Sequence, residues 1–131
     1  MANEGQIVRR SIGIAFSDGG LLALSAVRPE GAGGQGEERI VAVLCAPDGA
    51  PVEVSETLLS TEYGEDGVQR RATLELWLDD EGGGQPLRGA GTLISSSQVS
   101  HPGLTGTIAF FRWALEGREG LGHYEVVRSD G

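Results

Sequence analysis

Cysteine is almost absent from this chain. The 131 residues include a single cysteine, Cys45, so the chain can form no internal disulfide and no cysteine-based zinc site. Cys45 lies in the apolar run RIVAVLCA, where a buried and unreactive thiol is expected. The two histidines, His101 and His123, do not have the spacing of metal ligands. We therefore expect neither a metal ion nor a cofactor.

Long apolar runs and an excess of positive charge are also missing. No stretch approaches the length of a membrane span, and the start, MANEGQIVRR, lacks the apolar core of a signal peptide. These absences predict a cytoplasmic protein with no membrane partner. Nineteen acidic residues against ten basic ones give a net charge of −9, which favours solubility and argues against nucleic acid as a partner.

Glycine, in contrast, is abundant. The 22 glycines follow no collagen-like period, so they predict the turns and bulges of an antiparallel β protein. Asp-Gly pairs in SDGG (17–20) and PDG (47–49) suit tight turns, because aspartate bonds to the local backbone and glycine accepts positive φ. No segment shows a helical period with caps. The composition therefore predicts an all-β fold.

Alternation of apolar and polar residues predicts the strands. The clearest case is Val68–Leu78, where Ala72, Leu74, Leu76 and Leu78 share one face. We predict eight strands: Gln6–Phe16, Leu21–Arg28, Arg39–Ala46, Pro51–Ser60, Val68–Leu78, Pro86–Ser97, Leu104–Glu116 and Leu121–Arg128. The length fits one domain over residues 1–131.

Eight sequential antiparallel strands favour a single up-and-down β-barrel. Closure removes the unpaired edges that a flat sheet would expose. A two-sheet β-sandwich is the alternative, since the strand pattern alone does not separate the two folds. A barrel of this strand number can be filled by its own side chains or can hold a small ligand.

The register of the last hairpin decides which side chains face the interior. We predict a three-residue loop with Gly120 in the left-handed position, because this loop avoids positive φ at Arg118 and Glu119. A two-residue loop would instead pair Arg112 with Glu125 on the outer face, as an ordinary cross-strand ion pair.

The three-residue loop predicts a ligand-binding inner wall. On this hypothesis Phe111, Trp113 and Leu115 face inward together with His123 and Glu125. A buried carboxylate needs a partner, which His123, Arg70 or Arg10 could supply. The sequence thus makes Glu125 and His123 candidate catalytic residues for proton transfer, and Arg70 a candidate ligand-binding residue. A structural polar network within the barrel is the alternative interpretation.

Two segments carry a family resemblance. EGREGLGHYE, within Phe110–Arg128, and RATLELWLDDEGGGQPLRGAG (Arg71–Gly91) resemble the lipocalin-like domains of the hydroxyneurosporene synthase (carotenoid 1,2-hydratase) and AttH superfamily. The resemblance covers about half of the chain. It implies a calycin-type barrel with an apolar ligand cavity, and it marks Gly122, Tyr124 and Glu125 as motif positions. Tyr124 is accordingly expected to bind the ligand.

Three hypotheses for function remain at this point. The first is a binding module for a small hydrophobic molecule such as an isoprenoid, a polyketide or a lipid. The second is a small hydratase, isomerase or cyclase that uses His123 and Glu125. The third is a homodimer built on the two-sided apolar strand Arg39–Ala46 and an outward-facing Trp77.

Overall fold

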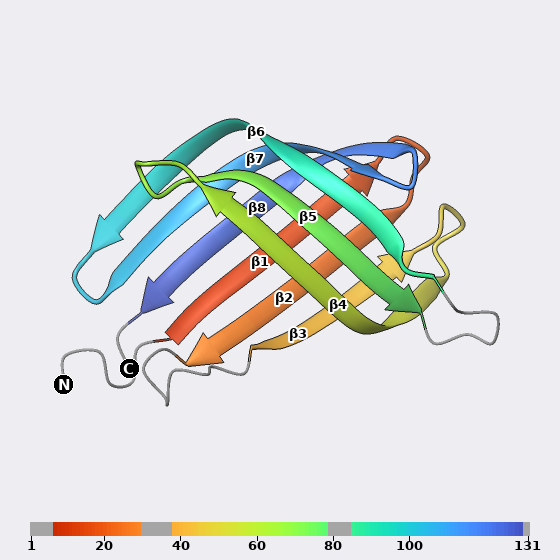
Figure 1. Cartoon of the computed structure of the whole chain (residues 1–131), viewed down its shortest axis with the longest axis horizontal. Coiled ribbons are helices and arrows are strands. Elements are labelled where there is room, and N and C mark those ends of the chain that lie inside the picture. The colour runs from red at the N-terminus through yellow and green to blue at the C-terminus, as the bar shows by residue number, and fades with distance from the viewer. Residues whose placement is uncertain (1–6, 30–37, 79–84, 130–131) are drawn as a thin grey trace.

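The computed structural model describes residues 7–29, 38–78 and 85–129, which form a closed antiparallel β-barrel (Figure 1). Each strand pairs with the next one along the chain, and β8 closes the barrel by pairing with β1. The strands are β1 (Ile7–Phe16), β2 (Leu21–Pro29), β3 (Arg39–Cys45), β4 (Pro51–Tyr63), β5 (Gln69–Leu78), β6 (Leu87–His101), β7 (Leu104–Leu115) and β8 (Arg118–Ser129). The predicted all-β barrel is confirmed, and the sandwich alternative is wrong. Within the described ranges, no helix is long and apolar enough to cross a membrane.

Three of the hairpin turns use the same local chemistry. In each, an aspartate side chain accepts a hydrogen bond from the backbone N–H two residues later: Asp18 from Gly20, Asp48 from Ala50 and Asp66 from Val68, at 2.9 to 3.0 Å. The glycine between them has φ between 81° and 97°. These turns confirm that the Asp-Gly pairs mark hairpins.

The turn between β7 and β8 differs from both predicted loops. It consists of Glu116 and Gly117, which have φ of 49° and 83°, as a primed turn requires. Positive φ is uncommon for glutamate. Here the Glu116 carboxylate accepts a hydrogen bond from the Arg88 N–H at 2.7 Å, and the Glu116 N–H donates to the Arg88 carbonyl at 3.0 Å. The neighbouring β6 thus holds the turn in place.

Because this turn comes earlier in the chain than predicted, the register of β8 differs from the predicted one. Phe111 pairs with Gly122, and Trp113 with Gly120, so Gly120 lies within a strand and not in a loop. Phe110 pairs with His123 and Ile108 with Glu125. The prediction that His123 and Glu125 face the interior is therefore wrong. Their outer position agrees with the two-residue alternative, although the partner of Glu125 is Ile108 rather than Arg112.

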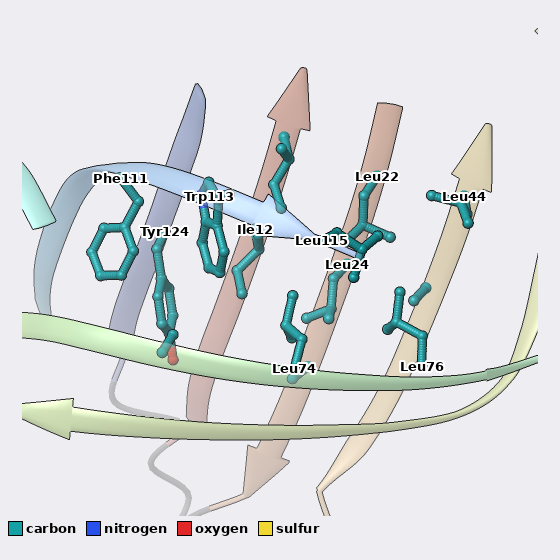
Figure 2. Packing of buried hydrophobic residues seen from close by; sticks show 14 of the residues in the cluster. Ile12, Leu22, Leu24, Leu44, Leu74, Leu76, Phe111, Trp113, Leu115 and Tyr124 are labelled. Carbon is teal, nitrogen blue, oxygen red and sulfur yellow. The ribbon is translucent and has the colours of Figure 1, made fainter. Parts of the chain in front are cut away.

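The interior is packed with apolar side chains contributed by all eight strands. Figure 2 shows the rings of Phe111, Trp113 and Tyr124 side by side next to the aliphatic part of this cluster. The ring centroids of Phe111 and Trp113 lie 5.1 Å apart, and those of Phe111 and Tyr124 lie 5.7 Å apart. Both separations fall in the favourable range for aromatic pairs. The aromatic rings therefore form one half of the core and the leucines of β2, β3 and β5 the other.

The two ends of the barrel differ. At the end where β1 and β7 finish, the guanidinium of Arg118 lies 4.5 Å from the centre of the Phe16 ring. Arg118 also donates to the Asp18 carboxylate at 2.7 Å, and this hydrogen bond lowers the pKa of that carboxyl. These contacts hold Arg118 over the Phe16 ring at this end of the barrel. The opposite end, where β1 begins and β8 finishes, carries the polar groups of a cavity described below and is here called the open end.

Candidate functional site

Four of the predicted ligand-binding residues lie inside the barrel. Phe111, Trp113 and Leu115 face inward from β7, as the alternation predicts, and each is at most 2% exposed. Tyr124 also faces inward from β8, where the corrected register places it. The inner wall expected from the sequence is therefore present on β7, and its β8 half consists of Gly122, Tyr124 and Val126.

The two candidate catalytic residues lie together, but on the outer face. The side chains of His123 and Glu125 are 44% and 37% exposed, and His123 Nε2 lies 3.8 Å from Glu125 Oε2. The imidazole also lies against Gly13, where an added Cβ would meet it at 2.7 Å. Both side chains are thus open to solvent and do not face the barrel interior. Their catalytic role stays a prediction.

Arg70 is placed away from the barrel interior. It lies next to the bulge where β4 and β5 change register, and its guanidinium pairs with the Asp66 carboxylate at 3.2 Å. Both side chains are about half exposed. The expectation that Arg70 would balance a charge within the barrel is wrong, and Arg10 holds that position.

Arg10 organises a polar network at the open end. Its Nε donates to the Glu38 carboxylate at 2.9 Å, and its Nη1 donates to the Tyr124 hydroxyl at 3.2 Å. A second contact joins Nη2 of Arg10 to Glu38. Thr61 and Tyr124 share a hydrogen bond of 2.5 Å between their hydroxyl groups. The network thus links β1, β4 and β8 with the residue that precedes β3.

Burial and hydrogen bonding act together on these groups. Burial alone would lower the pKa of the Arg10 guanidinium, but its hydrogen bond to Glu38 and the nearby Tyr124 raise that pKa overall. Burial raises the pKa of the Tyr124 phenol, although the hydrogen bond to Thr61 and the charge of Arg10 oppose this change. At neutral pH Arg10 is therefore charged and Tyr124 is a neutral hydroxyl.

A cavity of about 210 Å³ adjoins this network. It is lined by Val8, Arg10, Arg28, Glu38, Tyr63 and Arg128. Val8 is buried and supplies an apolar floor, while the arginines and Glu38 supply charge. The combination of one apolar surface with convergent polar groups is typical of small-molecule sites.

Two buried polar atoms in the interior lack a hydrogen-bond partner among the described residues. They are the Oε1 of Gln69 and the indole Nε1 of Trp113. Gln69 pairs across the strands with Tyr63, which lines the cavity, and its Nε2 donates to the Tyr124 carbonyl at 2.9 Å. An unpaired buried polar group costs about 1–3 kcal/mol, and neither of these two residues lines the cavity.

The barrel is least continuous between β3 and β4. Only three residue pairs join these strands, all near Cys45 and Pro51, whereas seven pairs join β2 to β3. Toward the open end the two strands diverge, as Figure 1 shows. Arg10 binds Glu38 on the β3 side and contacts Thr61 on the β4 side, so its side chain bridges this seam.

The outer surface carries a larger hollow of about 360 Å³ over β4, β5 and β6. Its lining includes Ser60, Thr73 and Ala90, which face outward, and the oppositely charged cross-strand neighbours Glu62 and Arg71. The cavity at the open end, in contrast, adjoins the hydrogen-bonded network of Arg10 and is lined by three guanidinium groups. We therefore take the open end as the candidate site.

Sequence reasoning missed most of the open end. Arg28, Arg128, Glu38 and Tyr63 come from four separate segments, and no local motif joins them. One signal was present: alternation that places Val8 and Ile12 inward also places Arg10 inward, and a charged residue at such a position marks a polar site.

No family model matches this chain, and no curated protein matches it. The closed eight-stranded antiparallel barrel is consistent with a lipocalin-like fold. The fold is compatible with ligand binding.

Proposed function

We propose that the protein binds a small hydrophobic molecule at the open end of the barrel. The observation that carries this proposal is the cavity beside Val8, in which the apolar surfaces of Val8 and Tyr63 meet several convergent charged groups. The apolar body of the ligand would lie on Val8 and Tyr63. The resemblance to lipocalin-like domains, which implies an apolar ligand cavity, also favours a small hydrophobic ligand.

The size of the cavity limits the ligand. About 210 Å³ is smaller than the pockets of roughly 300–1,000 Å³ that hold drug-sized molecules. A one-ring or two-ring compound or a short chain fits this size. Arg10, which lines the cavity, also bridges the diverging strands β3 and β4. The barrel can therefore widen at this position without breaking the longer strand pairings.

The experiment is a calorimetric titration with 2-naphthamide, a neutral two-ring probe. We expect saturable binding of one molecule per chain. The Tyr63→Ala variant should weaken this binding several-fold, because it removes an aromatic wall that is partly exposed and contributes little to the core. Leu58→Ala is the matched control, since Leu58 is a comparably exposed apolar residue of the same strand outside the cavity.

Absence of saturable binding to a folded protein would overturn the proposal. Equal loss of affinity in both variants would also overturn it, because the probe would then bind somewhere other than the open end. Circular dichroism and the thermal midpoint of each variant verify that the barrel is intact.

A further inference from the structure

Three arginines converge on the open end, and the strand register explains why. On β1, Val8 points into the barrel. It pairs with Arg28 on one side and with Arg128 on the other. Directly opposed residues of an antiparallel pair lie on the same face of the sheet. Arg28 and Arg128 therefore project on the same side as Val8, and Arg10 follows two residues deeper on β1.

Among the described residues, the lining of this cavity has a charge opposite to that of the whole chain. The net charge of the protein is −9, but the cavity is lined by three guanidinium groups and one carboxylate, Glu38. That carboxylate is already engaged by Arg10. Among the described residues, no ion pair joins Arg28 or Arg128 to an acidic side chain. Two like charges are thus held near a third, an arrangement that an anion would relieve.

We propose that the ligand of the open end is an amphipathic acid, with a carboxylate or similar oxyanion bound by Arg28 and Arg128. This inference rests on the proposed function and specifies the chemistry of its ligand. Arg28 and Arg128 lie two strand spacings apart, or about 10 Å between backbones, a gap that two long side chains can close around one anion. The apolar body of the acid then lies on Val8 and Tyr63.

Arg10 has a different task in this arrangement. Its donors already serve Glu38, Thr61 and Tyr124, so it holds the inner end of the site in place. Arg28 and Arg128 are exposed at the rim, where they meet a ligand that arrives from solvent. Binding of the acid requires no change in the resident pair of Arg10 and Glu38.

The test compares 2-naphthoate with 2-naphthamide, which differ in charge but hardly in shape. In calorimetric titrations at low salt we expect naphthoate to bind about tenfold more tightly, the effect of a charge-assisted hydrogen bond. Arg28→Gln and Arg128→Gln should each remove most of this preference and leave the affinity for naphthamide unchanged. Arg9→Gln is the matched control, because Arg9 is an exposed arginine between Val8 and Arg10 that is not part of the cavity lining.

The outcomes separate this inference from the proposed function. Equal affinities for the two probes, or a preference that survives both arginine variants, would overturn the anionic ligand and leave a binder of neutral molecules. Loss of the preference in Arg9→Gln as well would overturn it too, because a general charge effect would then explain the result. If neither probe binds, both proposals fail.

Discussion

At the scale of single residues, the interior depends on large side chains that face glycines on neighbouring strands. Trp113 lies between Gly91 of β6 and Gly120 of β8, and Phe111 lies opposite Gly122. Gly122 also allows β8 to approach β1 closely, because a Cβ at this position would lie 1.8 Å from the carbonyl oxygen of Gly13. The large side chains of β7 thus fit against the glycines of β6 and β8.

Replacement of Gly122 by alanine should destabilise the barrel. The added methyl group collides with backbone and not with a movable side chain, so β1 and β8 must separate. We expect the free energy of unfolding in urea to fall by about 3 kcal/mol. Gly106→Ala is the control, since a Cβ there meets its neighbours at 3.6 Å, an ordinary contact. Equal stability of the two variants would contradict the β1–β8 register.

Tyr124 gives a second residue-scale prediction, in the alkaline range. Burial raises its pKa, so the folded protein keeps the phenol proton at a pH where the unfolded chain, with a pKa near 10, has lost it. The stabilising contribution of this proton is complete below about pH 10 and is lost as the pH rises above that value. Stability should therefore fall more steeply above pH 10 in the parent protein than in Tyr124→Phe.

The measurement is an absorbance titration at 295 nm. The difference between the parent protein and Tyr124→Phe isolates the phenol of Tyr124, and its midpoint should lie above the ordinary value of about 10. A midpoint at or below that value would contradict the burial of this phenol, because burial is what raises its pKa.

At the scale of strands and turns, the pattern of the sequence predicts most of the architecture. Alternation locates all eight strands, because one face of each meets an apolar interior. The β7–β8 turn escapes prediction for a physical reason. Glu116 adopts a positive φ that its type disfavours, and its compensating hydrogen bonds come from Arg88, far away in the sequence. That displacement moves His123 and Glu125 to the outside.

The seam between β3 and β4 supplies the prediction at this scale. Because Arg10 bridges the strands where their backbones no longer pair, Arg10→Met should open the seam and leave Glu38 without its partner. Both side chains are mostly buried, so we expect a loss of about 1–3 kcal/mol. Amides of β3 and β4 should then exchange hydrogen faster, while those of β7 and β8 change least.

Arg9→Met provides the comparison for this experiment. Arg9 is exposed on the outer face of β1, one residue from Arg10. The substitution at Arg9 should leave the exchange rates of β3 and β4 unchanged. Uniform acceleration over the barrel in Arg10→Met would mean that the network stabilises the whole fold and has no special role at the seam.

At the scale of the whole molecule, the candidate site emerges only when the barrel closes. Val8, Arg28 and Arg128 become neighbours because β2 and β8 both pair with β1. In the sequence, each of these arginines is simply a charged residue near the end of a strand. The inner wall of Phe111, Trp113 and Leu115 could be predicted from alternation along one strand, whereas the open end depends on the registers of several strands.

A backbone amide NMR titration with 2-naphthoate tests directly whether the ligand binds at the open end. Saturable chemical-shift changes should centre on Val8, Arg10, Tyr63, Arg28 and Arg128. Residues of the outer hollow, such as Thr73 and Ala90, should not move. Shifts confined to that outer hollow, or no saturable shifts at all, would contradict ligand binding at the open end.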